Sequence, residues 1–413
     1  MKILFVADGR SPTAINWMQH FIAAGHEVHL ASTFPSAPLA GAASHHVIPV
    51  AFSGVVAEND AAPGGGGLLK RVTTPQVRTR IRQWAGVLTL PRAARQLTGL
   101  IHTLQPDLVH AMRIPFEGML ASLALAALEF HRTPPALQNP AFINLAMRKA
   151  PLVISIWGND FTLHAPANPM MRYRTRQALR LADAIHADCQ RDIRLAYEWG
   201  FPSEKPFTVL PGGGGVQPDI FYPPLRAQPA APLPFTIIHP RGMRAYVHNE
   251  EFFRAIPLVL AKFPGARFIC TGMAGEAQAE AWVRELGIAS SVELLPRVPR
   301  AEMGDLFRRA QVCVSLTSHD GTPNTLLEAL ACGCYPVAGD LESIREWIKP
   351  GENGTLVNPA NPDEIARGII GAIENPGLRD QARGQNIQII RERALHAPVM
   401  RAAEAFYEEL VQG

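Results

Sequence analysis

The segment from Ser315 to Glu346 contains the residues whose types and spacing best suit chemistry. Its sequence is SLTSHDGTPNTLLEALACGCYPVAGDLESIRE, in which an apolar strand is followed by a turn and by a helix that is expected to begin near Asn324. Asp320 precedes this helix and Glu328 lies about one turn inside it, so the two carboxylates could hold two hydroxyl-bearing parts of one ligand. The helix N-terminus adds backbone N–H groups and a positive dipole end, which favour an anion such as a diphosphate.

Glu328 is the more informative of the two acidic residues. An arbitrary Asp and Glu eight residues apart are usually a solvated turn residue and a helix-surface residue. In the stretch LLEALA, however, the neighbours of Glu328 are apolar on every side. A carboxylate in such a helix needs a polar partner, and a ribose diol is a suitable one. Gly321, directly after Asp320, would let backbone approach the ligand closely.

The elements around this segment are predicted to form two halves in which strands and helices alternate. Such alternation is typical of parallel, doubly wound α/β sheets, in which ligands bind at the carboxyl ends of the strands. With two such halves, we expect the site in the cleft between them. The predictions for the first half include strands at Lys2–Ala7, Glu27–Ala31 and Val47–Ala51, a helix over Ala14–Ala24 with Thr13 as N-cap, and a helix over Arg174–His186.

Length and composition agree with this organisation. A chain of 413 residues predicts two domains. With 47% hydrophobic and 18% charged residues it is not a coiled coil, a collagen or a highly charged disordered chain. The proline-rich segment 217–233 is predicted to be a linker between a domain over 1–216 and a domain over 234–398.

The segment DGTPNTLLEALACGCYPVA resembles the signature of retaining GT-B glycosyltransferases of family 4. In that signature seven residues separate two glutamates; here Asp320 replaces the first and Glu328 matches the second. The likeness continues at Glu346 and in the turn at Asn353, and it extends over most of the chain. In the first half it includes GHEV, PDLVHA, ADAIHAD and VLPGGGGVQPDIF, and WGND, which places Trp157 where the family more often has a His facing the donor sugar.

The resemblance implies a GT-B fold of two Rossmann-like domains, with a C-terminal helix over 399–413 that packs back on the first. It also implies transfer of a sugar from a nucleoside diphosphate sugar, with retained anomeric configuration and without a metal or other cofactor. Asp320 would then hold hydroxyls of the donor sugar, and Glu328 the hydroxyls of the ribose. Backbone groups of four residues would contact sugar and phosphate, namely Gly321, Thr325, Leu326 and Leu327.

Cationic residues should stabilise the departing diphosphate in such an enzyme. Arg241 matches the phosphate-binding Arg of the family, whereas the position of its Lys falls at Tyr246. Arg244 or His248 could supply the missing charge. The residues expected on the opposite, acceptor-side lip are Gly9, Arg10, His110 and Asp160, although His110 is equally well interpreted as a packed residue at a strand end.

The residues agree with the absence of a metal centre, because no DxD triplet follows a strand and no His and carboxylate cluster is evident. The five scattered cysteines predict buried thiols in a reducing cytosol rather than a disulfide scaffold. Neither a signal peptide nor an apolar run of spanning length is found, so we expect a soluble cytoplasmic protein.

A basic stretch lies in the first half. Positions 61–106 contain no Asp or Glu, so this window has a formal charge of +7 while the rest of the chain has −4. We interpret the stretch either as a solvated helix face or as a peripheral contact with an anionic membrane through residues 70–95, which would suit a lipid-linked or anionic acceptor. One basic stretch without a known binding module does not indicate nucleic-acid binding. Its basic residues are Lys70, Arg71, Arg78, Arg80, Arg82, Arg92 and Arg95.

Two other readings of the same fold stay open. A nucleotide-sugar epimerase would convert the donor without an acceptor, and a non-catalytic relative would bind nucleotide sugar without turnover. A phosphorylase is disfavoured, because the last third of the chain offers only Lys349, in the turn KPGENG, for a pyridoxal cofactor. A dinucleotide-dependent oxidoreductase is disfavoured because the first turn, DGRSPT, lacks the G-x-G-x-x-G fingerprint.

Overall fold

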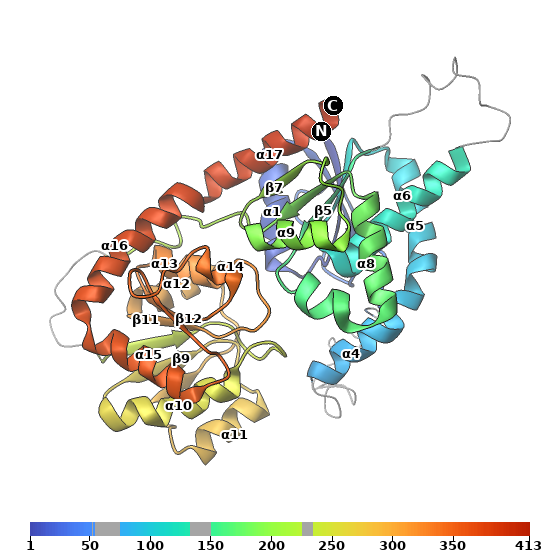
Figure 1. The fold of residues 1–413 in the computed structure, drawn as a ribbon. Helices are drawn as coiled ribbons and strands as arrows, with labels where there is room; N and C mark the ends of the chain where they lie inside the picture. Colours follow the sequence, from blue (N-terminus) through green and yellow to red (C-terminus); the bar gives the residue numbers. More distant parts are fainter. Residues whose placement is uncertain (52, 54–74, 133–149, 225–233) are drawn as a thin grey trace. The chain divides into compact units, whose positions relative to one another are not determined.

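The structure is a computed structural model that describes all residues except 52, 54–74, 133–149 and 225–233. It divides into two compact units, which are coloured along the sequence in Figure 1. The first unit consists of Met1–Gly214 together with Met400–Gly413, and the second consists of Gly215–Val399. Each unit contains one parallel sheet and is described by itself. None of the described helices combines the length and the apolar character needed to cross a membrane.

The first unit is built on a seven-stranded sheet in the order β3-β2-β1-β4-β5-β6-β7, with parallel pairing throughout. The central strands are buried along almost their whole length, as apolar runs covered on both faces should be. The chain order reverses between β1 and β4, and the carboxyl ends of these strands therefore flank a topological switch point. The strands are β1 (Lys2–Ala7), β2 (Glu27–Ser32), β3 (Ser44–Val47), β4 (Leu108–Ala111), β5 (Leu152–Ile156), β6 (Ala184–Ala187) and β7 (Phe207–Val209).

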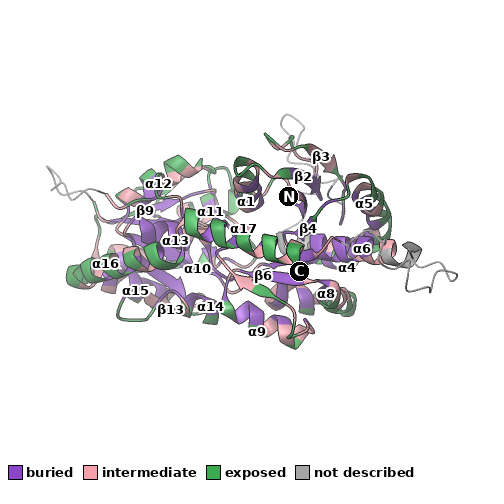
Figure 2. Ribbon diagram, turned by 90° about the horizontal axis from the view of Figure 1, so that it is seen from above, coloured by how far each residue is buried: buried purple, intermediate pink, exposed green. Residues whose placement is uncertain are grey.

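Helices of this unit pack on the sheet with their apolar sides buried and their polar sides exposed, a division that Figure 2 shows as purple and green. They are α1 (Pro12–Ala23), α4 (Pro75–Ala85), η1 (Gly86–Thr89), α5 (Leu90–Leu104), η2 (Ile114–Gly118), α6 (Met119–Arg132), η3 (Asp160–His164), η4 (Ala165–Ala167), α8 (Pro169–Leu181) and α9 (Gln190–Trp199).

Three predictions for the first unit were wrong in detail. Ser11, not Thr13, caps α1: its hydroxyl accepts a hydrogen bond from the backbone of Ala14, and Pro12 suits the first helical position. The third strand is β3 rather than Val47–Ala51. The predicted helix Arg174–His186 ends at Leu181, and β6 follows. Tertiary pairing of β6 with β5 and β7 therefore overrides the helical spacing of that segment.

The second unit has a six-stranded parallel sheet in the order β10-β9-β8-β11-β12-β13, with its switch point between β8 and β11. Here α13 begins at Asn324, where the sequence predicted a helix, whereas α14 and β13 were not predicted. The strands are β8 (Thr236–His239), β9 (Arg267–Cys270), β10 (Val292–Leu294), β11 (Val312–Ser315), β12 (Tyr335–Gly339) and β13 (Thr355–Val357). The helices are α10 (Asn249–Lys262), α11 (Ala277–Glu285), α12 (Arg300–Arg309), α13 (Asn324–Ala331), α14 (Glu342–Arg345), α15 (Pro362–Glu374) and α16 (Pro376–Arg393).

The end of the chain returns to the first unit. Helix α17 (His396–Gln412), red in Figure 1, places the fully buried Tyr407 against Phe21, with ring centroids 4.8 Å apart and nearly parallel planes. The segment expected to be a linker begins by packing on the second unit: Phe221 is buried, and the carbonyl of Ile220 accepts a hydrogen bond of 2.7 Å from Arg308.

Candidate functional site

Two of the predicted site residues meet at the switch point of the second unit. Arg241 follows β8 and Asp320 follows β11, and Nη2 of Arg241 donates a hydrogen bond of 2.6 Å to Oδ2 of Asp320. Both side chains are largely buried, with 12% and 17% of their surface exposed. Burial lowers the pKa of Arg241, but the neighbouring Asp320 and Tyr246 outweigh it, so that the net shift is upward. The guanidinium therefore stays charged at the carboxyl edge of this sheet.

The second predicted carboxylate, Glu328, lies in α13 with only 11% of its side chain exposed. Burial raises its pKa to about 7, although the charge and hydrogen bond of Arg300 oppose the rise. Nη2 of Arg300 lies 2.9 Å from Oε1 of Glu328, and its guanidinium lies 5.3 Å from the ring centroid of Phe221. Arg300 was not among the residues predicted from the sequence. The available signal was a cation in the first turn of α12, where it opposes the helix dipole.

The neighbourhood of this site contains buried polar atoms that no described residue satisfies. They are Nε of Arg241, Oγ of Ser315 and Oγ1 of Thr325. Buried polar groups are normally hydrogen-bonded, so these atoms are suited to a polar ligand. Ser315 ends β11, and Thr325, one of the predicted contact residues, lies in the first turn of α13.

Two glycines allow close backbone approach at the same edge of the sheet. Gly242 after β8 and Gly272 after β9 have left-handed backbone conformations, with φ of 61° and 68°. A Cβ atom on Gly242 would lie 3.2 Å from the carbonyl oxygen of Gly272, so a side chain there would meet both strain and crowding. The sequence analysis singled out neither glycine.

The remaining donor-side candidates separate into two groups. Gly321, Leu326 and Leu327 are buried and belong to the turn and first half of α13 that lead to Glu328. Arg244, by contrast, is exposed, and its Nη1 lies 3.4 Å from the hydroxyl of Tyr246.

His248, the other proposed substitute for the missing Lys, lies just before α10. Its Nδ1 is 3.4 Å from a carboxylate oxygen of Glu251. The imidazole thus has an acidic neighbour already, whereas the guanidinium of the exposed Arg244 contacts a backbone carbonyl and the hydroxyl of Tyr246, each at 3.4 Å. Of the two, the structure leaves Arg244 the better placed to meet an anion from solvent.

In the first unit, the predicted residues Gly9, Arg10 and Asp160 follow β1 and β5 at the carboxyl edge of the sheet. Gly9 has no room for a side chain, because a Cβ atom would lie 2.3 Å from the hydroxyl of Ser36. Arg10 forms two hydrogen bonds with Asp8, of 3.0 and 3.1 Å. This edge therefore presents a polar surface beside the switch point between β1 and β4.

Asp160 is buried and well partnered. It accepts hydrogen bonds from Nε of Arg113, at 3.0 Å, and from the backbone of Ile114 and Trp157. Burial raises the pKa of Asp160 and these partners oppose the rise. The guanidinium of Arg113 also lies 5.3 Å from the ring centroid of Trp157. Asp160 thus holds together the segments that follow β4 and β5 and sits beneath the surface.

His110 does not line a surface at all. Its side chain is fully buried and is part of a chain of hydrogen bonds that ties α17 to the sheet, so the packed interpretation is the correct one. These hydrogen bonds begin at Nε1 of Trp17, which contacts the hydroxyl of Tyr407, and that hydroxyl contacts Nδ1 of His110. Nε2 of His110 contacts Ser155, and Ser155 contacts Nδ1 of His186. The last bond joins Nε2 of His186 to the carbonyl of Leu210.

The direction of this chain follows from its last acceptor. The carbonyl of Leu210 only accepts, so Nε2 of His186 must hold the proton and Nδ1 must accept from Ser155, at 2.9 Å. Ser155 has then used its only proton and accepts from Nε2 of His110, at 2.8 Å. Nδ1 of His110 is thereby left to accept from Tyr407. Both imidazoles must therefore be neutral, and burial lowers the pKa of each.

Among the described residues, one group of side chains has ligand atoms close enough together for a metal ion: Asp188, Cys189 and Asp192, just after β6. Arg191 points into this group, with Nη2 at 2.7 Å from Oδ1 of Asp192. A guanidinium already neutralises this carboxylate, so the group is better explained as a buried ion pair at the start of α9.

Comparisons with known proteins bear on both units. Residues 233–388 match the family described as Glycosyl transferases group 1, and residues 9–213 match the Glycosyl transferase 4-like domain. The chain belongs to the group 1 glycosyltransferases. The signature around Glu328 lies inside the first of these matches, and the polar edge at Arg10 lies inside the second.

Curated relatives of this family match parts of the chain. The phosphatidyl-myo-inositol mannosyltransferase of Mycobacterium tuberculosis is 31% identical over 132 residues, which are 31% of this chain and 34% of the relative. A D-inositol 3-phosphate glycosyltransferase from Thermobispora bispora is 24% identical over 253 residues, 57% of this chain and 58% of the relative. The chain thus spans about a third of the first of these relatives and three fifths of the second.

Solved structures of similar proteins cover the whole chain and show the fold, which is GT-B. Sucrose-phosphate synthase from Thermosynechococcus elongatus aligns with a TM-score of 0.71 at 14% identity, over 99% of both chains. Anabaena HepE in complex with UDP and glucose aligns with a TM-score of 0.68 at 15% identity, over 99% of this chain and 100% of HepE.

Proposed function

We propose that this group 1 glycosyltransferase transfers a sugar from a nucleoside diphosphate sugar to an acceptor, with retention of configuration and without a metal ion. The observation that supports this most is the pairing of Arg241 with Asp320 at the switch point, just before α13, in which the buried Glu328 lies about one turn from the start. The proposal also draws support from HepE, a protein of similar fold whose solved complexes contain UDP, glucose and UDP-glucose.

In this proposal the charged side chains of the second unit stabilise the diphosphate and hold the sugar and the ribose. Arg241 binds the diphosphate and stabilises the negative charge that develops on it as the sugar departs, and the α13 N-terminus assists through its dipole. Asp320, now paired with Arg241, accepts from hydroxyls of the donor sugar, and Glu328 accepts from the ribose. An Arg–phosphate contact can be bidentate, which fixes orientation as well as charge.

A thermal-shift screen of the full chain against UDP, GDP and ADP sugars tests the donor site, because a ligand that binds only the folded state stabilises it. We expect one nucleotide class to raise the melting temperature. Arg241→Met should weaken the binding of that nucleotide by roughly ten- to a hundredfold, which is the effect of losing one charge-assisted contact.

The matched control is Arg254→Met on α10, where the arginine is 62% exposed and paired with Glu250. This variant should bind the nucleotide as the wild type does. A wild-type chain that responds to none of the nucleotides, or an Arg241→Met variant that responds normally, would contradict the donor-site assignment.

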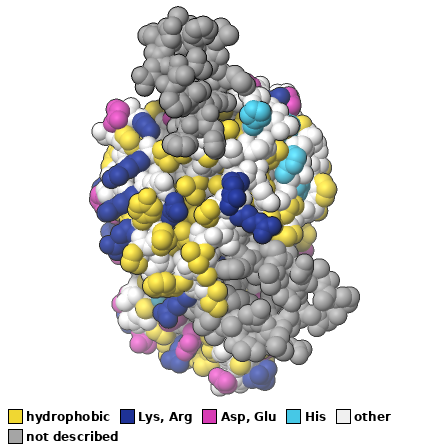
Figure 3. All heavy atoms as spheres, turned by 90° about the vertical axis from the view of Figure 1, so that its right-hand side faces the viewer, with side chains coloured by type: hydrophobic (Ala, Val, Ile, Leu, Met, Phe, Trp, Pro, Cys, Tyr) yellow, Lys and Arg dark blue, Asp and Glu magenta, His cyan; other side chains and the backbone are white. Residues whose placement is uncertain are grey.

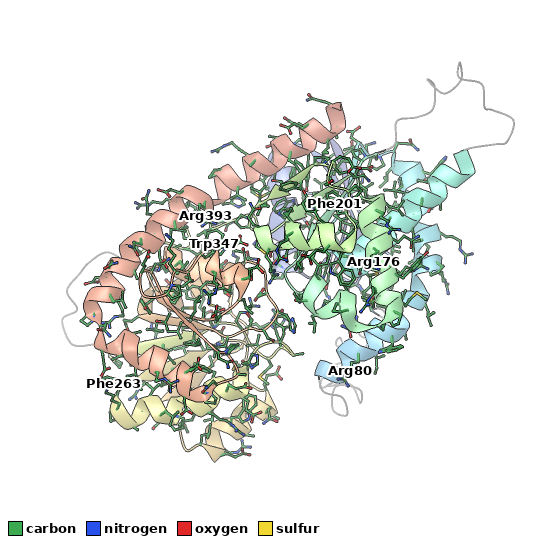
Figure 4. All side chains as sticks on the ribbon, viewed as in Figure 1. Arg80, Arg176, Phe201, Phe263, Trp347 and Arg393 are labelled. Atoms are coloured by element: carbon green, nitrogen blue, oxygen red, sulfur yellow. The ribbon has the colours of Figure 1, made fainter. Side chains whose placement is uncertain are left out.

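We further propose that the first unit contacts an anionic membrane through one face of α4, η1 and α8. Large apolar side chains are exposed there, including Trp84 at 65% and Leu88 at 76%. Figure 3 shows hydrophobic and basic side chains mixed on the side of the molecule where these helices lie, and Figure 4 labels Arg80 and Arg176 on α4 and α8. Exposed members of this face are Arg80, Ile81, Trp84, Leu88, Met170, Arg172, Tyr173 and Arg176.

The structure changes which residues this membrane proposal depends on. Lys70 and Arg71 lie outside the described residues, as does the side chain of Arg78. Arg92 and Arg95 are exposed on α5. Arg82, by contrast, turns inward, so the surface is formed by α4 and α8 rather than by the whole basic stretch. Basic residues beside exposed Trp and Tyr suit the headgroup region of a bilayer, where a lipid-linked acceptor would be found.

Vesicle flotation at low salt tests this face. The wild-type chain should float with vesicles that contain phosphatidylglycerol but not with pure phosphatidylcholine, because anionic lipid attracts each surface arginine by about 1 kcal/mol. Trp84→Ser combined with Arg176→Ser should reduce the floated fraction severalfold. Arg92→Ser, on the separate helix α5, serves as the control. Equal flotation of the double variant and the wild type would rule out this face.

A further inference from the structure

At the switch point of the first unit lies an arginine that forms no ion pair with any described carboxylate. Arg82 reaches inward from α4, with its guanidinium 4.9 Å from the ring centroid of Phe34 and 5.7 Å from that of Phe116. Phe34 follows β2 and Phe116 follows β4, so the guanidinium lies at the carboxyl edge of the sheet. Its Nε atom is buried and has no hydrogen-bond partner among the described residues.

A carboxylate in the same place is incompletely partnered as well. Glu117, in η2 directly after β4, is 5% exposed. Its Oε1 accepts a hydrogen bond of 2.6 Å from the hydroxyl of Thr33, whereas Oε2 is buried and unsatisfied by the described residues. The charge of Glu117 acts on Arg82, but the two form no described ion pair. A buried donor atom and a buried acceptor atom thus lie at the same edge of the sheet, and neither has a hydrogen-bond partner among the described residues.

The neighbouring charges explain why Arg82 favours an additional anion. Arg10 is engaged by Asp8, and Arg113 is engaged by Asp160. Burial lowers the pKa of Arg82, and the nearby Arg113 and Arg10 lower it further, while Glu117 and Asp8 only partly compensate. An unpartnered cation under such conditions gains more from a bound anion than an exposed arginine does.

We propose that Arg82 and Glu117 form a binding site for an acceptor that presents a phosphate group beside hydroxyls, with the phosphate on Arg82 and a hydroxyl donating to Oε2 of Glu117. This inference rests on the proposed transferase function and assigns the acceptor side to the switch point of the first unit. The site is built by the segments that follow β1, β2 and β4 and by α4. Ligands of open parallel sheets bind at the carboxyl ends of the strands, so a ligand is expected at this edge. A phosphate can come from a soluble molecule or from a lipid headgroup, and both offer the same chemistry.

The test uses the full chain saturated with UDP, GDP or ADP, whichever the nucleotide screen identifies, so that the donor site is occupied and phosphate binding reports on the first unit. Calorimetric titration with glycerol 3-phosphate should show binding, and glycerol should show none. Arg82→Met should lower the affinity for glycerol 3-phosphate by roughly ten- to a hundredfold, as expected for the loss of one charge-assisted contact. Glu117→Gln should lower this affinity less, because the amide retains one acceptor oxygen. Arg95→Met, exposed on α5 of the same unit, is the matched control and should bind as the wild type does.

The binding of the donor nucleotide identified by the screen separates the possible failures for each variant. If Arg82→Met binds that nucleotide normally but no longer binds glycerol 3-phosphate, the site is supported. If Arg82→Met is poorly folded, the same comparison with Glu117→Gln decides. Glycerol 3-phosphate that does not bind the wild type, or that binds all variants equally, overturns the inference. A wild-type chain that binds none of UDP, GDP and ADP contradicts the donor site instead. A parallel flotation with phosphatidylglycerol vesicles identifies the source, because a lipid headgroup predicts that Arg82→Met lowers flotation and a soluble acceptor predicts no change.

Discussion

Glu328→Gln should remove most of the transferase activity and at the same time make the folded protein more stable. The side chain keeps its shape but loses the charge that the proposed ribose contact requires. A hydrogen bond to a charged group contributes about 1.5–3 kcal/mol, so kcat/KM should fall roughly ten- to a hundredfold with any donor that the nucleotide screen identifies. Glu328→Ala should lower kcat/KM further, because Arg300 would then lose its carboxylate partner in a largely buried position.

The expected gain in stability follows from the pKa of Glu328. Burial raises that pKa from 4.5 to about 7, so the folded chain binds more protons than the unfolded chain between these values. Stability therefore falls as the pH rises from 4.5 to 7, and a destabilisation of up to about 3 kcal/mol is fully present above pH 7. A neutral Gln avoids this cost. At pH 8 the variant should consequently melt at a higher temperature than the wild type.

Both effects can be measured on one preparation, by initial rates and by thermal melting at pH 6 and pH 8. The wild-type rate should also decline below pH 7 as Glu328 takes up its proton. Glu285→Gln, on the exposed side of α11, is the control and should change neither rate nor stability. Near-native turnover in Glu328→Gln would exclude the assigned role, whereas loss of activity without a gain in stability would mean that the carboxylate is not held at an electrostatic cost.

The second unit could be predicted from sequence because its signals are local. Helix α13 begins at Asn324, where the sequence predicted it, and α15 begins at a proline as such helices often do. The pairing of Arg241 with Asp320 could not be predicted from local signals, because the two lie 79 positions apart in the sequence. It follows only from the strand order, which puts β8 beside β11. The sequence suggested both residues, and the sheet brought them together.

The roles of Arg300 and Arg82 could not be predicted from the sequence, because each role depends on the residues that the side chain contacts in the fold. Arg300 is an ordinary arginine until α12 places it 2.9 Å from Glu328. Arg82 belongs to a stretch of seven basic residues that looks uniform, and only the packing of α4 distinguishes it from the exposed Arg80. In β6 the local pattern even favoured the wrong element. Helical spacing over Arg174–His186 competes with strand pairing, and a single sequence contains no information about the partner strands.

The buried network around Tyr407 leads to a prediction about acid stability. Its hydrogen-bond directions require both imidazoles to be neutral, because a second proton on either ring would place a donor against a donor. Burial lowers the pKa of His186 from 6.5 to about 4 and that of His110 well below its ordinary value. Between pH 6.5 and 4 the folded chain therefore binds fewer protons than the unfolded chain. The stability that these residues contribute is fully present above pH 6.5 and is lost as the pH falls toward 4, by roughly 3 kcal/mol for His186 alone.

Denaturant titrations of the full chain at pH 7.5, 6 and 5 measure this loss, and Tyr407→Phe identifies the transition that belongs to the first unit. That variant should lower the stability of the transition by about 1–3 kcal/mol, because the Trp17 donor and the His110 acceptor each lose a buried partner. His186→Gln should cost stability at pH 7.5 but flatten the decline toward pH 5, since the titrating group is gone. His102→Gln, exposed on α5, should leave the slope unchanged. A slope that is as steep in His186→Gln as in the wild type would show that other groups cause the acid sensitivity and that the network does not.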